Sequence, residues 1–450
     1  MIPERWRGGE AVVIGIARSG VSAGLLLRRL GLAVYASDAG TSPALQESAA
    51  RLAAAGCAVE TGRHDLERIA RARVAVVSPG VPPAAPPYAA AERSGVPVVS
   101  ELDLAARCLE GTRLVVTTGT KGKSTTSALI AHLLEATGLG SGPAAGNIGR
   151  ALADVVLEGT PPAWLAVEAS SFQLHDCPAL APAVGVLTNL SPDHLDRYPS
   201  LDDYYADKAR LFRNAGEASR WVSNGDDHAV VAMTRDVPGT HERFSLAVTV
   251  ADGWFDRQAG WLVVRGMPLV RRRDLNLLGD HNVANALAAA LALPREADRD
   301  RMAEALRSFR ALHHRLEPVR EVHGVLWVND SKSTTVASTR SALEALERPV
   351  VLLIGGRDKG GDFRDLASAL RGARAVIAYG EAGPRVAAEL EGLAPVVREG
   401  SDFAAIMARA RATARPGDAV LLAPACSSFD MFQNAEERGE VFSRMVEAMA

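Results

Sequence analysis

One stretch of the sequence, which joins an apolar strand to a helix through a glycine-rich turn, constrains the fold most. The apolar residues 114–116 precede the run Gly119-Thr120-Lys121-Gly122-Lys123-Ser124. Glycines let backbone N–H groups approach phosphate oxygens, a lysine can reach the β- and γ-phosphates, and a serine hydroxyl at a helix N-terminus can ligate Mg²⁺. The run predicts a nucleotide site in an α/β fold, and an ordinary strand-to-helix turn with a surface lysine is the alternative.

The turn departs from the general phosphate-loop pattern at one position. Thr117 stands where that pattern has a glycine, so the loop is a shorter Gly-Thr-x-Gly-Lys-Ser variant. This points away from switch GTPases and motor ATPases.

Composition narrows the class of protein further. The chain has 450 residues, 48% of them hydrophobic and 23% charged, with a net charge of -3. A chain of this length favours two to three domains of roughly 100–200 residues. We expect a cytoplasmic protein with no nucleic-acid partner and no membrane insertion, because no basic patch, leader or long apolar run is evident. Its four cysteines lack the Cys-x-x-Cys spacing of a zinc site.

Apolar strands alternate with amphipathic helices along the whole chain, which predicts α/β layers with parallel sheets. We expect three domains, over 1–107, 108–311 and 312–450. Short alternating runs between 244 and 278 predict an antiparallel addition to the central sheet. Other buried strands are expected at 11–14, 33–36, 74–77, 97–99, 325–328, 350–354, 375–379 and 419–423.

The first domain carries a turn that is similar to a dinucleotide fingerprint. The run Gly15-Ile16-Ala17-Arg18-Ser19-Gly20 follows a strand, and Asp38 ends the next strand, with Ala17 in place of the middle glycine. A dehydrogenase is therefore one interpretation, but the same turn suits any diphosphate, including that of a nucleotide-sugar. Ser78-Pro79-Gly80 follows another strand and could line the same ligand.

Two polar residues follow strands of the central domain. Glu168 ends an apolar strand, and carboxylates at such positions beside a phosphate loop commonly hold Mg²⁺. His194 lies in a polar turn with Asn189, Asp193 and Asp196. This histidine is either a second metal ligand or general base, or a structural residue.

A lysine lies on the apolar face of the helix expected at 201–212. The apolar stripe includes Tyr204, Leu211 and Phe212, and helical spacing puts Lys208 on the same face. The side chain can snorkel to water, which is the ordinary outcome. Burial would instead lower the amine pKa and favour a neutral amine that captures CO₂ as a carbamate.

Together these residues resemble the Mur ligase family of ATP-dependent amide-forming enzymes over essentially the whole chain. The resemblance includes the turn Gly146-Asn147-Ile148-Gly149 and implies a Rossmann-like N-terminal domain, a central P-loop ATPase-like domain and a Rossmann-like C-terminal domain. It implies ATP and Mg²⁺ as cofactors, and a carbamylated Lys208. The implied metal ligands are Ser124, Glu168, His194 and Lys208. The implied nucleotide contacts are Gly119, Thr120, Lys121, Gly122, Lys123, Ser124, Thr125, Asn282, Asn285, Arg315 and Asp330.

The third domain is similar to the D-glutamate-adding branch of this family. Asp330-Ser331-Lys332 follows a strand, Lys359 lies in a glycine-rich turn, and 423–432 resembles the branch's C-terminal signature. The resemblance implies Thr334, Lys359 and Ser428 as amino-acid contacts. Ala435 stands where relatives place an aromatic residue, and Phe432 is a candidate replacement.

The implied reaction joins UDP-N-acetylmuramoyl-L-alanine to D-glutamate through an acyl-phosphate, in a monomer. Lys123, His194, Lys208 and Lys332 are the implied catalytic residues. The implied UDP-sugar contacts are Ser19, Asp38, Ser78, Gly80 and Asn147. Three alternatives stay open: another amino-acid-adding Mur-type ligase, an NAD(P)-dependent oxidoreductase, and a non-catalytic nucleotide-binding regulator.

Overall fold

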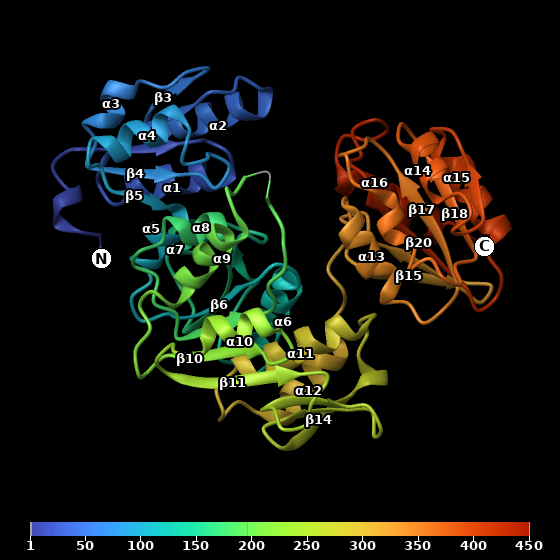
Figure 1. Ribbon diagram of the computed structural model, residues 1–450. Coiled ribbons are helices and arrows are strands. Elements are labelled where there is room, and N and C mark those ends of the chain that lie inside the picture. Colours follow the sequence, from blue (N-terminus) through green and yellow to red (C-terminus); the bar gives the residue numbers. More distant parts are fainter. Residues whose placement is uncertain (1, 196, 450) are drawn as a thin grey trace. The chain divides into compact units, whose positions relative to one another are not determined.

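The computed structural model describes residues 2–195 and 197–449, in which three sheets follow one another along the chain (Figure 1). The chain forms two compact units. One comprises Met1–Arg272 with Ala284–Arg307, and the other comprises Arg273–Val283 with Ser308–Ala450. The first two sheets belong to the first unit and the third sheet to the second.

The first sheet is wholly parallel, with strand order β3-β2-β1-β4-β5. This confirms the Rossmann-like expectation for the N-terminal part. Only β3 was missed, because this short edge strand has no fully buried residue and so gives little apolar signal. Its elements are η1 (Glu4–Trp6), β1 (Glu10–Ile14), α1 (Arg18–Arg29), β2 (Ala33–Asp38), α2 (Pro43–Ala54), β3 (Ala58–Thr61), α3 (Leu66–Ala70), β4 (Val74–Val77), α4 (Pro86–Arg93), β5 (Val98–Ser100) and α5 (Glu101–Ala106).

The central sheet has nine strands in the order β14-β13-β12-β11-β10-β9-β6-β8-β7. Its β6 lies between β8 and β9. The antiparallel pairs β12–β13 and β13–β14 confirm the expected antiparallel addition. Its strands are β6 (Arg113–Thr118), β7 (Ala145–Gly146), β8 (Trp164–Glu168), β9 (Val184–Leu187), β10 (Arg220–Asn224), β11 (Thr240–Ser245), β12 (Gly253–Asp256), β13 (Trp261–Val264) and β14 (Met267–Arg271).

Helices connect the strands of this central part. The phosphate-loop helix α6 follows β6 directly, and α9 carries Lys208. The helices are α6 (Lys123–Ala136), α7 (Leu152–Glu158), α8 (Ser171–His175), α9 (Leu201–Ala209), η2 (Arg210–Phe212), α10 (His228–Thr234), η3 (Arg272–Asp274), α11 (Asp280–Ala292) and α12 (Arg299–Ser308).

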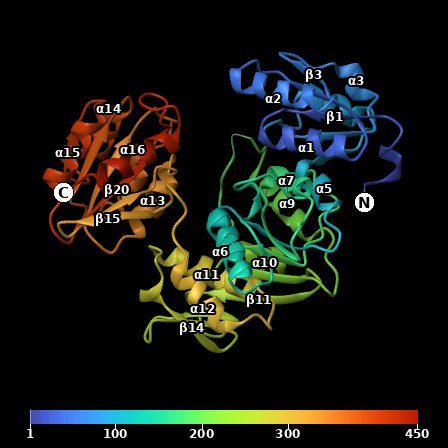
Figure 2. The same cartoon turned by 180° about the vertical axis from the view of Figure 1, so that it is seen from behind.

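The third sheet has the order β15-β16-β20-β17-β18-β19, parallel except for the pair β15–β16. Helices α13 and α14 pack on one face and α15 and α16 on the other, in two separate apolar clusters (Figures 1 and 2). Its elements are β15 (Glu317–Val322), β16 (Val325–Asn329), α13 (Val336–Glu344), β17 (Val350–Gly355), η4 (Phe363–Leu366), β18 (Ala375–Tyr379), α14 (Gly383–Leu390), β19 (Val396–Arg398), α15 (Phe403–Thr413), β20 (Ala419–Ala425) and α16 (Ala435–Glu447).

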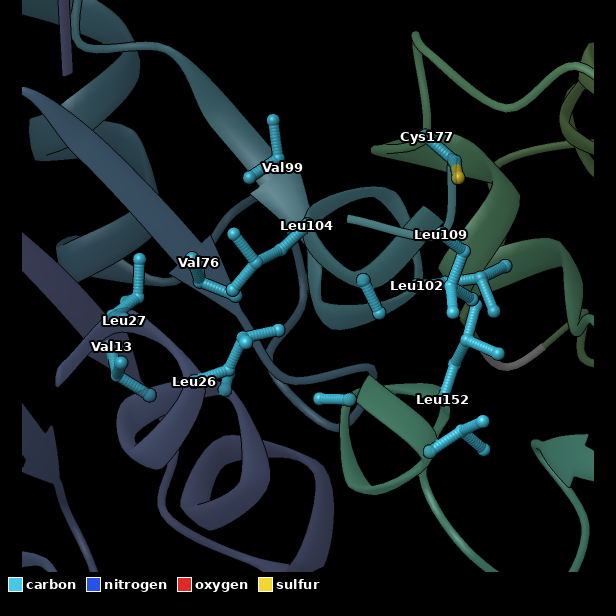
Figure 3. Close-up of a cluster of buried hydrophobic side chains, with 14 of the residues drawn as sticks. Val13, Leu26, Leu27, Val76, Val99, Leu102, Leu104, Leu109, Leu152 and Cys177 are labelled. Carbon is cyan, nitrogen blue, oxygen red and sulfur yellow. The ribbon is translucent and has the colours of Figure 1, made fainter. Parts of the chain in front are cut away.

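The first two sheets share one apolar core. Figure 3 shows Leu102 and Leu109 beside Leu152, while Leu26 and Leu27 come from helix α1. The same cluster reaches Val116 of β6 and Trp221 of β10. The expected boundary at 107 therefore falls inside a continuous core, and the boundaries at 107 and 311 stay a prediction.

Among the described residues, no helix combines the length and the apolar character that crossing a bilayer requires.

Candidate active site

The phosphate loop requires its two glycines. Gly119 has φ 143° and Gly122 has φ 81°, both in the region that favours glycine. A Cβ atom on Gly119 would lie 2.0 Å from Thr188 Oγ1, and one on Gly122 would lie 2.5 Å from Asn285 Oδ1. Side chains of neighbouring segments therefore approach the loop backbone closely, as a pre-shaped phosphate cradle needs.

Residues that follow β9 hold the loop in place. Asn189 Oδ1 accepts from the backbone N–H of Lys121 at 2.9 Å, and its Nδ2 donates to the Lys121 carbonyl at 2.9 Å. Thr188 Oγ1 donates to the same carbonyl at 2.7 Å. Thr120 Oγ1 donates to the Ser191 carbonyl at 3.1 Å. The polar turn that the sequence singled out around His194 thus begins with the residues that fix the phosphate loop.

Asn285 lies against this loop, whereas Asn282 belongs to the other compact unit. Asn285 Oδ1 accepts from Thr126 Oγ1 at 3.2 Å, one turn into α6. Asn282 Nδ2 donates to the Leu278 carbonyl at 2.8 Å. Both lie near the start of α11. Their roles toward adenine stay a prediction.

The lysine of the loop folds over its own turn. Lys123 Nζ donates to the carbonyls of Gly119, at 3.1 Å, and Thr120, at 2.9 Å. Ser124 and Thr125 follow it in the first turn of α6 and are partly buried.

Lys208 is buried beside the same carbonyl. Its side chain lies on the buried face of α9 and is 1% exposed, as the stripe of Tyr204 and Leu211 predicted. Its Nζ donates to the Gly119 carbonyl at 2.6 Å and lies 4.6 Å from the Tyr204 ring centroid. Burial and then the neighbouring Lys123 charge lower the pKa of Lys208 to about 7, although Asp193, Glu168 and Asp207 oppose the shift.

Glu168 presents one bonded and one unbonded oxygen at the end of β8. Its side chain is 1% exposed, and Oε1 accepts from Asn147 Nδ2 at 2.8 Å. Oε2 is buried, and no described residue donates a hydrogen bond to it. A buried carboxylate oxygen without a donor is costly unless a cation or water completes its coordination. The residues present therefore fit a hard cation at this position.

His194 lies in the left-handed region, with φ 55°, and is exposed. Its ring centroid is 5.1 Å from that of Phe172 and 6.1 Å from that of Tyr204. No three histidine, cysteine, aspartate or glutamate side chains among residues 2–195 and 197–449 are grouped to hold a metal. The predicted set, which mixes a hydroxyl, one carboxylate, one imidazole and a modified lysine, stays a prediction, and Asp196 lies outside the described residues.

Three predicted UDP-sugar residues gather at the carboxyl ends of β1, β2 and β4. Asp38 Oδ2 accepts from the Ile16 N–H at 3.0 Å, and Ser78 Oγ donates to the Gly15 carbonyl at 2.7 Å. Ser19 Oγ lies 3.5 Å from Ser78 Oγ. Asn147 instead bonds Glu168, and Gly80 follows Ser78 in the β4 loop.

One contact between the N-terminal turns and the turn after β9 left no signal in the sequence. Arg197, in the turn after His194, donates to the Pro79 carbonyl at 2.6 Å and lies over the Phe172 ring, 4.1 Å from its centroid. Arg18 similarly donates to the carbonyl of Gly149. The N-terminal turns are thus tied directly to the turn that carries Asn147 and to the turn that carries His194.

In the second unit, the structure brings two of the three predicted amino-acid contacts together. Lys359 Nζ donates to Thr334 Oγ1 at 3.1 Å. Ser428 is buried in the loop after β20. Lys332 pairs with Glu436 at the start of α16.

Three more residues of the second unit, Asp330, Cys426 and Phe432, were singled out by the sequence. Burial raises the pKa of Asp330 to about 6, and its Oδ1 accepts from the Leu316 N–H at 3.0 Å. Burial likewise raises the pKa of Cys426 to about 12, so its thiol stays protonated. The Phe432 ring packs edge-on against Phe403, with centroids 5.2 Å apart. That Phe432 replaces the aromatic residue which relatives have at the position of Ala435 stays a prediction.

All lysines of the chain lie in the regions just described. They are Lys121, Lys123, Lys208, Lys332 and Lys359. Apart from histidine, every other basic side chain is an arginine.

Family models match three successive segments of the chain. The Mur ligase MurD-like, N-terminal domain matches residues 9–100, the Mur ligase middle domain matches 117–293, and the Mur ligase, glutamate ligase domain matches 314–426. A UDP-N-acetylmuramoylalanine--D-glutamate ligase from Salinibacter ruber is 40% identical over 463 residues, covering 100% of both chains. The ligase of that name from Acidobacterium capsulatum is 38% identical and covers 98% of this chain and 96% of its own.

The chain belongs to the Mur ligase family.

Solved Mur ligases share its fold. The crystal structure of UDP-N-acetylmuramate-alanine ligase MurC from Thermotoga maritima has a TM-score of 0.61 and 19% identity, covering 98% of this chain and 99% of its own. MurF ligase from Thermotoga maritima, in complex with ADP, has a TM-score of 0.57 and 19% identity, covering 84% and 90%. This Mur ligase therefore has the three-domain α/β fold that the sequence predicted.

Proposed function

We propose that this Mur ligase joins UDP-N-acetylmuramoyl-L-alanine to D-glutamate, with ATP as the phosphoryl donor, in the synthesis of peptidoglycan precursors. The names of full-length relatives support the substrates. The observation that carries the chemistry is the buried Lys208 amine on the Gly119 carbonyl of the phosphate loop. A nucleotide-binding regulator has no need of that costly burial.

ATP and Mg²⁺ are the proposed cofactors. Ser124, Glu168, His194 and a carbamylated Lys208 would hold the metal, and the buried Oε2 of Glu168 supports this assignment. Bound Mg²⁺ would neutralise charge on the transferring phosphoryl group.

The chain's own residues would then orient three substrates. Lys123 would move from the loop carbonyls to the γ-phosphate as the UDP-substrate carboxylate attacks it, which gives an acyl-phosphate and ADP. The neutral D-glutamate amine attacks the acyl carbon, loses a proton, and expels inorganic phosphate to leave the amide. Lys332 and Arg315 would offset negative charge during these steps, as the family resemblance implies.

The remaining predicted residues complete the binding sites. Ser19, Asp38, Ser78, Gly80 and Asn147 would contact the UDP-sugar. Thr334, Lys359 and Ser428 would contact the D-glutamate carboxylates, and the 3.1 Å contact between Lys359 and Thr334 supports that grouping. Nucleotide contacts would come from residues 119–125 with Asn282, Asn285, Arg315 and Asp330. We further propose a cytoplasmic monomer, which light scattering during gel filtration would test.

One assay tests the reaction. Phosphate release is measured with ATP, Mg²⁺, UDP-N-acetylmuramoyl-L-alanine and D-glutamate, and with each substrate omitted in turn. We expect release only when both organic substrates are present. Release with L-lysine in place of D-glutamate would assign another member of the family, and an NAD(P) absorbance change without phosphate release would favour the oxidoreductase.

A further inference from the structure

Helix α16 places a fully buried arginine beneath the strand-end loops of the third sheet. Arg438 is 0% exposed, and it forms no ion pair with any residue in the described part of the chain. Burying a cation is costly unless its hydrogen-bonding groups are satisfied. Its acceptors are neutral oxygens, and they belong to two different loops.

The guanidinium bridges the loop after β16 to the loop after β20. Nε donates to Ser331 Oγ at 3.0 Å, and Nη2 donates to the Ser331 carbonyl at 3.0 Å. The Cys426 carbonyl accepts from Nη2 at 3.3 Å and from Nη1 at 3.4 Å. A planar fork with several donors can make these bonds at once, and a single ammonium group cannot reproduce them.

The third loop, after β17, closes over the same guanidinium. A Cβ atom on Gly356 would lie 3.3 Å from Arg438 Nη1 and 2.2 Å from the Ser427 carbonyl. The backbones of Arg357 and Ser427 exchange hydrogen bonds of 2.9 and 3.0 Å. Arg438 is therefore the common support of the three loops that carry Thr334, Lys359 and Ser428.

Helix α16 gives this arginine a rigid base. Asn329 Nδ2, at the end of β16, donates to the Gly439 carbonyl at 2.9 Å and to Ser443 Oγ at 2.9 Å. A Cβ atom on Gly439 would lie 2.2 Å from His314 Nδ1, so the helix packs closely against that side chain. Ser331 Oγ also donates to the Ala435 carbonyl at 2.7 Å, at the start of the helix.

We propose that Arg438 is a positioning residue for amino-acid selection, which holds the loops after β16, β17 and β20 in the arrangement that binds the D-glutamate carboxylates. The assignment of the pocket rests on the function proposed above. The loop support itself rests on the hydrogen bonds of Arg438 and is measurable without any substrate.

Hydrogen–deuterium exchange of the apoprotein tests the support directly. Arg438→Lys keeps the charge but loses the fork, and Arg438→Met removes both. Arg444→Lys is the matched control, because Arg444 lies on the same helix and is exposed. We expect faster exchange at 331–334 and 426–428 in both Arg438 variants and not in Arg444→Lys. Unchanged exchange in folded Arg438→Lys would overturn the proposal.

Steady-state kinetics test the selection. In Arg438→Lys we expect KM for D-glutamate to rise about tenfold or more, while KM for ATP stays within about twofold. Equal changes in both KM values, or none, would refute a positioning role. If both Arg438 variants fail to fold, Ser331→Ala removes the Nε acceptor together with the hydroxyl donor to the Ala435 carbonyl and should raise KM for D-glutamate about threefold; no rise there would also refute it.

The two proposals fail in different ways. A wild-type protein that shows no D-glutamate-dependent phosphate release refutes the proposed function and the link of Arg438 to D-glutamate, while exchange at the loops still decides the support. An active wild type with an unchanged KM for D-glutamate in Arg438→Lys refutes only the role of Arg438.

Discussion

One lysine in each compact unit shows a different environment: Lys208 is buried, and Lys332 forms a partly exposed ion pair. Lys208 in the first unit is 1% exposed and contacts a carbonyl and an aromatic ring, and its pKa is lowered to about 7. Lys332 in the second unit is partly exposed and pairs with Glu436. Burial disfavours the charged form of the first amine, whereas the second forms a partly exposed ion pair.

The loops of the two units are also held in place by different interactions. Around the phosphate loop, neutral hydrogen bonds with Thr188 and Asn189 fix the backbone. Around the third sheet, one buried guanidinium gathers the loops. A fixed backbone suits a polyphosphate, and loops gathered by one side chain suit the small amino acid of the proposed function.

The largest effect is expected at the phosphate loop. Lys123→Ala should lower kcat for phosphate release by about 10³ or more, since a positioned charge at the transferring phosphoryl group is removed. Lys121→Asn is the matched control, because Lys121 is exposed in the same loop and asparagine keeps the backbone N–H and carbonyl that Asn189 holds. It should change kcat less than about threefold. Comparable losses in both variants would contradict the special role of Lys123.

The buried amine gives the next largest effect and an unusual stability change. Lys208→Met should lower kcat by about 10²–10³ while raising the Tm of the apoprotein at pH 7. The folded pKa of Lys208 is about 7 against an ordinary value of 10.5, so the folded state binds fewer protons between these values. Burial of the Lys208 amine therefore destabilises the folded protein fully below pH 7, and this destabilisation disappears as the pH rises toward 10.5.

Thermal unfolding of wild type and Lys208→Met at pH 7 and pH 10 checks the direction of this change in Tm. The gain in Tm should be larger at pH 7, and Asp202→Asn, an exposed change on the same helix, should show no such difference. Wild-type turnover below pH 7 should also fall, because carbamate formation needs the neutral amine. A Lys208→Met protein with full activity would remove this lysine from the site.

A smaller effect is expected in the second unit. Lys359→Met should raise KM for D-glutamate about 10- to 100-fold with little change in KM for ATP, because a carboxylate loses a charged partner. Arg371→Met, an exposed cation in the same unit, serves as the control. If KM for ATP rises and that for D-glutamate does not, Lys359 acts elsewhere.

The smallest effect is expected at the ion pair. Glu436→Gln should change kcat by less than about threefold and the free energy of unfolding by less than about 1 kcal/mol. Hydrogen bonding to Lys332 lowers the pKa of Glu436, so its contribution is present above the ordinary value of 4.5 and is lost as the pH falls through the lowered one. Urea unfolding of wild type and Glu436→Gln at pH 7 and pH 3 measures this contribution. If Glu436→Gln lost several kcal/mol of unfolding free energy at pH 7, the ion pair would be a structural one.

The elements with strong apolar periodicity were predictable, and so was Lys208, whose helical spacing alone put it on a buried face. Strand β15 was not, because only Val322 of this edge strand is buried, and it pairs antiparallel with β16. The sequence also could not locate Arg438 or Arg197. Each of them contacts a carbonyl more than 100 residues away in the chain, and such a contact leaves no local pattern.

The confinement of lysine to five positions has a practical consequence. An amine-selective reagent can modify side chains only at Lys121, Lys123, Lys208, Lys332 and Lys359. Cleavage by a lysine-specific protease would cut the chain at those same places, so each resulting peptide except the C-terminal one ends at one of these five residues. Mass spectrometry of labelled wild-type protein, with and without each substrate, would therefore map occupancy of the site without a single engineered residue.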